Sequence, residues 1–155
     1  WFDWEKVDTA LLEFTHNLVE FRRAHPVFRR RRFLSGAEAS ELEWFTPAGA
    51  PMDGGDWADP NARAIAIYLD GSDAPDRAED GTPLVDDDFL VLVNSWWEPL
   101  DFALPDTRPQ ARWRVEIDSY DLASPPEVRG DERKPGDTVT AGPRSVVVLR
   151  SGYPG

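Results

Sequence analysis

The 155-residue chain contains no cysteine, only two histidines and a single methionine. The lack of cysteine excludes disulfide scaffolds, zinc–thiolate sites, thiol nucleophiles and iron–sulfur clusters. It is compatible with a reducing compartment, and we expect a cytoplasmic protein. Long apolar runs are missing too, since none approaches the roughly 20 residues of a membrane-spanning helix. We therefore expect no contact with a membrane.

Basic residues are scarce. The 17 lysines and arginines stand against 29 aspartates and glutamates, which gives a formal net charge of −12. General nucleic-acid binders and membrane-surface proteins need a positive field, so both classes are disfavoured. Apolar residues make up 41% of the chain and aromatic residues 12%, more than a disordered polypeptide would have. The length fits a single domain with a substantial core.

Charge is unevenly distributed along the chain. Six arginines fall within residues 22–32, and eleven acidic residues fall within residues 53–88. For the arginines we favour solvent exposure, or ion pairs with the chain's own carboxylates, over a phosphate or glycan contact. We interpret the acidic stretch as a solvent-facing insert. Asp86, Asp87 and Asp88 lack the alternate spacing and the glycine of a calcium-binding loop, so we predict no metal site there.

Residues 7–25 have the apolar spacing of one amphipathic helix. The apolar stripe consists of Val7, Leu11, Phe14, Leu18, Phe21 and His25. Asp3 or Asp8 can cap the start of this helix, and Pro26 ends it near His25. No second convincing helix follows. The stripe must therefore pack on a sheet, or on something outside this sequence.

The sequence after Pro26 is predicted to form strands and turns. Short apolar or alternating runs separated by proline and glycine are typical of an antiparallel β-sandwich. The predicted strands are Glu41–Thr46, Ala64–Leu69, Phe89–Val93, Asp101–Leu104, Trp113–Asp118, Thr138–Thr140 and Ser145–Leu149. The run Phe89–Val93 is apolar throughout, which predicts burial on both faces. The last two strands are expected to pair with each other around a turn at residues 141–143.

The predicted core draws on most of these strands. It contains Trp44, Ile65, Ile67, Leu90, Leu92, Val115, Ile117, Val146 and Val148. In the strand Trp113–Asp118 the alternation places Trp113, Val115 and Ile117 on one face.

Candidate catalytic residues are few. His16 and His25 lie nine positions apart, which does not suit a metal-binding pair on one helix, and we expect His25 to cap the helix or to pack. The chain has no nucleophile-elbow, phosphate-loop or dinucleotide-binding motif, and no carboxylate pair stands out from the acidic background. We therefore assign no catalytic, cofactor-binding or metal-ligating residue, and we expect no cofactor.

Tryptophan is the one strong enrichment, with seven residues. Aromatic rings stack on the C–H faces of sugars, so tryptophans in a sandwich hint at carbohydrate. For Trp44 and Trp113 we favour a place in the core. Trp96 and Trp97 would point to opposite faces if the chain were extended, so they can hardly share one core. One of them is expected at a turn, exposed or in an interface.

Segments spread over nearly the whole chain carry a family resemblance. The most specific is His25–Arg30, the second part of the segment Phe21–Arg30. The others are Trp1–Trp4, Leu11–Phe14, Trp44–Gly49, Met52, Asp56–Trp57, Phe89–Asn94, Glu98–Pro99, Phe102, Leu104–Pro105 and Arg144–Leu149. In this order they resemble the late part of bacterial glycogen debranching enzymes, isoamylase-type members of the α-amylase superfamily. Family members often carry two histidines where this chain has Trp96 and Trp97, so no family role is transferred to these positions.

The resemblance implies a catalytic (β/α)₈ barrel whose last helix leads into a C-terminal β-sandwich. Residues 1–32 would then be the last barrel helix and a connector, and residues 33–155 the sandwich. The family's catalytic carboxylates lie on earlier barrel strands, so this chain, beginning at Trp1, would be a non-catalytic fragment. Its parent would hydrolyse the α-1,6 branch linkages of glycogen by a retaining mechanism.

The partners implied are the parent's own barrel and, through the parent, branched glucan. With the barrel absent, the helix stripe could instead pair with a second copy in a homodimer. Two other functions stay open: an independent glycan-binding sandwich, and a structural or protein-interaction sandwich. An upstream reading frame of several hundred residues would favour the debranching enzyme over both.

Overall fold

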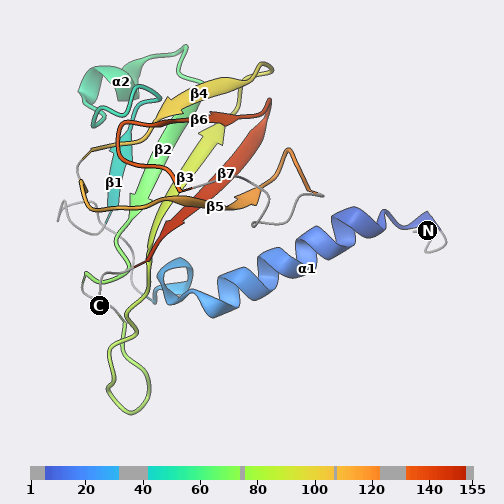
Figure 1. Ribbon diagram of the computed structural model, residues 1–155, viewed down its shortest axis with the longest axis vertical. Helices are drawn as coiled ribbons and strands as arrows, with labels where there is room; N and C mark the ends of the chain where they lie inside the picture. Colours follow the sequence, from blue (N-terminus) through green and yellow to red (C-terminus); the bar gives the residue numbers. More distant parts are fainter. Residues whose placement is uncertain (1–5, 32–41, 74–75, 107, 123–131, 153–155) are drawn as a thin grey trace.

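The computed structural model describes residues 6–31, 42–73, 76–106, 108–122 and 132–152. In this part of the chain two antiparallel sheets pack face to face, and one long helix projects away from them (Figure 1). The predicted antiparallel β-sandwich with a preceding helix is confirmed. The predicted domain boundary at residues 32–33 lies outside the described residues.

The larger sheet has five strands in the order β1-β2-β3-β7-β5, and every neighbouring pair is antiparallel. Its strands are β1 (Leu42–Phe45), β2 (Ala64–Leu69), β3 (Asp88–Asn94), β5 (Arg114–Asp118) and β7 (Ser145–Ser151). The smaller sheet pairs β4 (Leu100–Ala103) with β6 (Thr138–Ala141). Each observed strand begins and ends within two residues of its predicted position.

The predicted pairing of the last two strands is wrong. β6 pairs with β4, whereas β7 pairs with β3 and β5, so the intervening turn carries the chain from one sheet to the other. Arg144 in this turn adopts the left-handed conformation, with φ of 49°, and its N–H donates to the carbonyl of Trp96 at 2.8 Å. The turn predicted at residues 141–143 therefore crosses the sandwich instead of closing a hairpin.

The main core lies between the two sheets. It contains Phe45, Ala66, Tyr68, Leu90, Leu92, Phe102, Leu104, Ala111, Trp113, Val139, Ala141, Val147 and Leu149. Full burial of each large apolar side chain in this set stabilises the fold by roughly 1.5–3 kcal/mol. A second cluster lies on the other face of the larger sheet, where Val27, Leu69, Phe89 and Val148 are buried. The central strand β3 contributes Leu90 to one cluster and Phe89 to the other, which confirms its predicted burial on both faces.

Part of the predicted core is wrong, because several of its residues are not fully buried. Leu90 and Leu92 are fully buried as predicted, and Val148 is buried in the second cluster. The other predicted core residues are only half-buried: Trp44, Ile65, Ile67, Val115, Ile117 and Val146. For Trp44, Ile65, Ile67 and Val146 it is a neighbour in the sequence, Phe45, Ala66 or Val147, that is buried in the main core. Val115 itself packs against the main core, and Ile117 packs against the second cluster. In an amphipathic strand only the face covered by a second layer is sealed from water, and local alternation does not say which face that is.

A bulge in β5 changes which face its side chains occupy. Val115 is paired with Leu149, but Ile117 is paired with Val148, the preceding residue of β7, so Glu116 is the extra residue. Trp113 and Val115 consequently pack with the main core, while Ile117 packs with the second cluster. The prediction that all three share one face is wrong because a bulge inserts one residue into the alternation.

Helix α1 (Thr9–Ala24) begins at Asp8 and ends at His25. The Asp8 carboxylate accepts the N–H of Leu11 at 3.0 Å, which confirms one of the two predicted caps, while Asp3 lies outside the described residues. The helix leads into a 3₁₀ turn, η2 (Pro26–Arg29), and Figure 1 shows it extending away from the sheets. No residue of α1 is buried.

The expectation of a single helix is wrong, because a second short helix, α2 (Gly54–Ala58), precedes β2. The Asp53 carboxylate accepts the N–H groups of Gly55 and Asp56, and the Asp56 carboxylate accepts the N–H of Asp53 at 3.0 Å. This reciprocal capping stabilises a helix too short to show apolar periodicity. Neither α1 nor α2 has the length and apolar content needed to cross a bilayer.

Candidate functional site

The end of α1 is attached to the sandwich through the Asp86 carboxylate. One of its oxygens lies 2.8 Å from Nδ1 of His25, and the other accepts the backbone N–H of Val27 at 3.1 Å. The His25 and Asp86 side chains are only 12% and 7% exposed. The imidazole also packs on Phe21 and Phe89, with ring centroids 4.6 and 4.8 Å away. His25 thus caps the helix and packs, as predicted.

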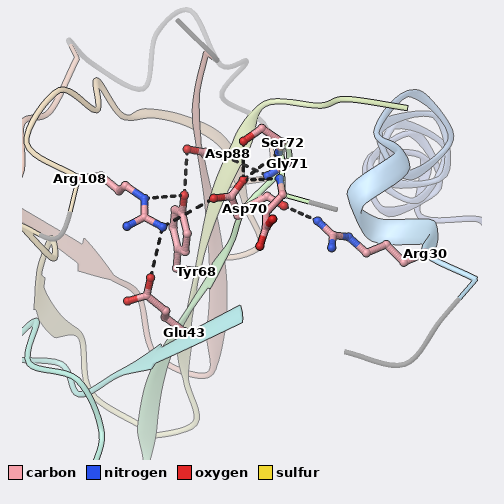
Figure 2. A network of polar contacts seen from close by, with 9 residues as sticks. Arg30, Glu43, Tyr68, Asp70, Gly71, Ser72, Asp88 and Arg108 are labelled. Carbon is pink, nitrogen blue, oxygen red and sulfur yellow. Dashed lines mark hydrogen bonds and ion pairs between the residues drawn. The ribbon is translucent and has the colours of Figure 1, made fainter. Parts of the chain in front are cut away.

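The arginines that follow α1 bind groups of the chain itself. Arg29 donates to the carbonyl of Arg23 at 2.8 Å, and the Arg30 guanidinium donates to the carbonyl of Asp70 (Figure 2). Arg23, 2.8 Å from a Glu20 oxygen, forms an ion pair of the expected kind, whereas Arg29 and Arg30 bind backbone carbonyls instead of carboxylates. Arg32, the last member of the basic run, lies outside the described residues. The Arg30 bond attaches the segment after η2 to the end of β2.

A network of polar side chains lies beside this attachment, at the end of β2 (Figure 2). The Tyr68 hydroxyl donates to Asp88 at 2.9 Å and accepts from Nε of Arg108 at 3.1 Å. Nη2 of Arg108 lies 3.4 Å from a Glu43 oxygen and 3.6 Å from an Asp70 oxygen. The Arg108 guanidinium also lies over the Tyr68 ring, 4.8 Å from its centroid. Strands β1, β2 and β3 and the segment before β5 thus meet around one phenol.

The pKa values of Asp70 and Asp88, two of the three carboxyl groups in this network, are shifted in opposite directions. Burial raises the pKa of Asp88 above its ordinary value. Burial acts in the same sense on Asp70, but the hydrogen bonds that it accepts from Ser72 and from the N–H of Asp73 outweigh it and lower the Asp70 pKa. Burial, reinforced by the negative charges of Asp88 and Asp70, strongly raises the pKa of Tyr68, so the phenol stays protonated. Its hydroxyl can therefore act as the donor to Asp88 at neutral pH.

The three consecutive aspartates at the start of β3 are separated by their partners. Asp86 binds the helix end, Asp87 lies 2.9 Å from Nε of Arg150, and Asp88 binds Tyr68 and the N–H of Gly71. Within the described residues, no group of three or more histidine, aspartate or glutamate side chains is placed to hold a metal ion. The acidic stretch is therefore not wholly solvent-facing, since its last residues turn inward.

A cavity of about 570 Å³ adjoins the network, but charged groups that face one another line it. Arg114 binds Glu132 at 2.7 Å, and Arg150 lies 3.8 Å from Glu116 on its wall. Asp88 and Arg108 reach the cavity from the network. Perturbed pKa values in a cavity can indicate catalysis, but ion-pair networks that hold a fold produce the same shifts. The partners of Asp70 and Asp88 favour the second explanation.

At the opposite end of β3, Trp96 and Trp97 lie in a bend that leads to β4. Their rings stack on each other, with centroids 3.7 Å apart and planes inclined by 24°, and Trp97 is 61% exposed. The prediction of a turn or an exposed position is confirmed, whereas their mutual stacking was not foreseen. Trp113 is buried in the core as predicted, but Trp44 is only half-buried. The ring centroid of Trp44 lies 5.3 Å from that of Trp57.

Two antiparallel sheets, with a helix attached at one end by buried polar contacts, define a β-sandwich domain whose described polar groups mainly hold the fold. The family model described as "Isoamylase, C-terminal" matches residues 41–149, and the chain belongs to this family.

Named relatives agree with this assignment. The chain is 34% identical over 160 residues to a "Glycogen operon protein GlgX homolog" of Mycobacterium tuberculosis, covering 97% of the chain and 22% of the relative. It is 28% identical over 120 residues to an isoamylase of Pseudomonas amyloderamosa, and the match covers 77% of the chain and 14% of the isoamylase. It is 26% identical over 149 residues to a glycogen debranching enzyme of Dickeya chrysanthemi, and the match covers 96% of the chain and 18% of that enzyme. The resemblance to glycogen debranching enzymes is confirmed.

Among solved structures, a type I pullulanase of Bacillus subtilis, crystallised with maltose, has the same fold. The TM-score is 0.56 at 20% identity, over 97% of this chain and 17% of the pullulanase. The chain thus spans about a fifth of the length of the relatives and structures that it matches.

Sequence reasoning missed most of the polar network. Tyr68, Asp70 and Arg108 come from positions up to 40 residues apart, and no local motif links them. Asp88 was noticed only as one of three adjacent acids. The usable signal was Tyr68 itself, since a tyrosine inside a buried strand needs a partner for its hydroxyl.

Proposed function

We propose that this chain is the non-catalytic C-terminal part of a glycogen debranching enzyme. In this proposal residues 1–32 form the last helix of the catalytic barrel and a connector, and residues 33–155 form the sandwich. The whole protein would hydrolyse α-1,6 branch linkages of glycogen in the cytoplasm. The family match, the names of the relatives and the fifth of their length that the chain spans support this proposal.

The exposed apolar face of α1 is the observation that carries the proposal. Leu11, Leu12 and Val19 are 52%, 59% and 45% exposed, and no residue of the helix is buried. Burying such side chains fully is favourable by about 1.5–3 kcal/mol each, and an isolated helix of this length is marginal in water. A helix that is attached firmly at His25 and has no buried residue along its length suits a partner domain that covers its apolar side chains.

The polar network supports a non-catalytic role. Retaining glycosidases place two carboxyl groups about 5–5.5 Å apart on either side of the scissile bond. Here Asp70 accepts bonds from Ser72 and Asp73, and Asp88 accepts bonds from Tyr68 and Gly71. Carboxylates held in this way stabilise loops and strand ends instead of attacking a sugar.

A reducing-end assay with branched glucan tests the absence of catalysis. We expect the purified chain to release no reducing ends, and activity that disappears when one of its carboxylates is mutated would contradict the proposal. Sequencing the gene upstream of Trp1 tests the parentage. A frame encoding several hundred more residues with a (β/α)₈ pattern is expected, and its absence would favour an independent glycan-binding or protein-interaction sandwich.

A further inference from the structure

The backbone of the bend after β3, which carries Trp96 and Trp97, is fixed by hydrogen bonds. Asn94, 1% exposed, donates from its amide to the carbonyls of Glu98 and Gly142, both at 2.9 Å, and accepts the N–H of Trp96 at 3.0 Å. The Trp96 carbonyl in turn accepts the N–H of Arg144 at 2.8 Å. Buried hydrogen bonds thus fix the position of this bend relative to both sheets, which reduces the entropy that ligand binding would remove.

The indole rings are fixed as well. Nε1 of Trp96 donates to the Glu98 carboxylate at 3.2 Å, and one face of Trp97 lies on Trp96. Because Trp97 is still 61% exposed, its other face is open to water. An indole placed in this way adds little to the core, yet it presents a flat apolar platform in a defined orientation.

A cavity begins at Trp96, the ring on which Trp97 stacks. Its volume is about 380 Å³, within the range of small-molecule sites, and it extends from Trp96 to the loop between α2 and β2. An adjoining cavity of about 240 Å³ continues along the same wall to Trp57, which is 55% exposed. Both cavities are lined by Asp56 and Arg63. Figure 1 shows α2 at the end of the sandwich opposite the attachment of α1.

The walls of the two cavities contain tryptophan rings together with side chains that can form hydrogen bonds. Arg63 is fixed by bonds to the carbonyls of Pro60 and Ala62 at 2.8 and 3.0 Å, and its guanidinium lies 5.9 Å from the Trp96 centroid. Asp59 and Asn61 line the first cavity. The Asp59 carboxylate has about four acceptor positions and accepts the N–H of Asn61 at 2.8 Å. The wall carries charges of both signs, which suits a neutral ligand with many hydroxyl groups.

We propose that Trp97, Trp96 and Trp57, with Arg63, Asp59 and Asn61, form a binding site for an α-1,4-linked glucan chain. One glucosyl ring stacks on the open face of Trp97, and the chain continues past the cavity toward Trp57. The side chains of Arg63, Asp59 and Asn61 exchange hydrogen bonds with sugar hydroxyls. The α-1,4 linkage rests on the proposed function, whereas the stacking platform rests on the geometry alone.

The test measures binding of maltoheptaose to the 155-residue chain by calorimetry and retardation of the chain in glycogen-containing gels. We expect millimolar or tighter affinity for maltoheptaose and none for cellohexaose. Trp97→Ala should weaken maltoheptaose binding about tenfold, as expected for a central aromatic contact. Trp57→Ala should weaken binding to maltoheptaose and to glycogen, whose chains are long enough to reach this residue. Trp97→Phe, which keeps a ring, should retain most of the affinity.

Val85→Ala is the matched control, because Val85 is also half exposed but lies in the loop before β3, away from the cavity. Each variant is checked by its thermal unfolding midpoint, so that loss of binding is not confused with loss of folding. Absence of maltoheptaose binding in the wild type, or equal binding in Trp97→Ala, would overturn the site. So would binding by the chain that disappears in the full-length protein, since the surface would then be a domain contact.

The two proposals fail in different ways. If the upstream gene encodes a barrel but maltoheptaose does not bind, only the glucan site is wrong. If maltoheptaose binds and the upstream gene encodes no barrel, the debranching assignment is wrong and the site stands.

Discussion

Nδ1 of His25 and a carboxylate oxygen of Asp86 lie 2.8 Å apart, although 61 residues separate them in the chain. This pair joins the end of α1 to the loop before β3. The same carboxylate accepts the N–H of Val27, so a single side chain fixes both the helix cap and the first residues of η2. The direction in which α1 leaves the sandwich depends on this contact.

We expect Asp86→Ala to lower the free energy of unfolding by about 1–3 kcal/mol, because it leaves the buried N–H of Val27 and the His25 ring without their acceptor. Urea unfolding measures the stability, and hydrogen exchange at Val27 reports the local loss. Glu20→Ala is the control, since it removes the exposed Glu20–Arg23 pair and should change stability by less than about 1 kcal/mol. Equal effects of the two variants would refute a special role for Asp86.

Tyr68→Phe removes the hydroxyl that donates to Asp88 and accepts from Arg108. We expect a loss of about 1–3 kcal/mol in unfolding free energy, since both partners lose a contact in a half-buried site. The raised pKa of Tyr68 adds a spectroscopic test. Up to about pH 11, near the ordinary titration range of tyrosine, phenolate absorbance at 295 nm should rise equally in the wild type and the variant. A smaller rise in Tyr68→Phe would mean that the phenol ionises in the folded protein.

Asp70→Asn and Asp88→Asn should change stability with opposite pH dependence. The pKa of Asp70 is lowered in the fold, so its contribution is present above the unfolded value of about 3.9 and is lost as pH falls through the folded pKa. The pKa of Asp88 is raised in the fold. Its contribution to the free energy of unfolding is therefore fully present below the pKa of the unfolded chain and is lost as pH rises through the folded pKa.

The stability difference between wild type and Asp70→Asn should therefore shrink as pH falls from 7 to about 3, while the difference for Asp88→Asn should grow. Denaturant unfolding at several pH values checks both slopes, with Asp101→Asn, an exposed position on β4, as the control. Slopes of the same sign in the two network variants would show that the two carboxylates do not differ as described.

The apolar stripe of α1, in which no residue is buried, should pair with a second copy when no other domain covers it. We expect the mass of the isolated chain, measured by light scattering, to rise with concentration toward a dimer. Leu11→Asp combined with Leu18→Asp should keep the chain monomeric, because it places charge on the stripe. Asn17→Asp adds charge at an exposed polar position and should leave dimerisation unchanged. A wild type that stays monomeric at every concentration rules out this dimer.

Local patterns were enough for α1, for the strands and for the family. Asp8 and Pro26 delimit α1, the runs that start at Leu42 and Ala64 form strands, and the segment Phe21–Arg30 carries the resemblance. Capping, alternation and proline geometry act over a few residues, so they can be recognised without knowing the rest of the molecule.

Contacts between distant segments decided what those patterns left open. The bulge at Glu116 moves Ile117 to the second cluster, and the second layer seals Tyr68 while Ile67 stays half-buried. The network of Tyr68, Asp88 and Arg108 and the stacking of Trp97 on Trp96 have no local signature. Burial and pairing depend on which surface covers each face, and only the packing of both sheets and η2 specifies that surface.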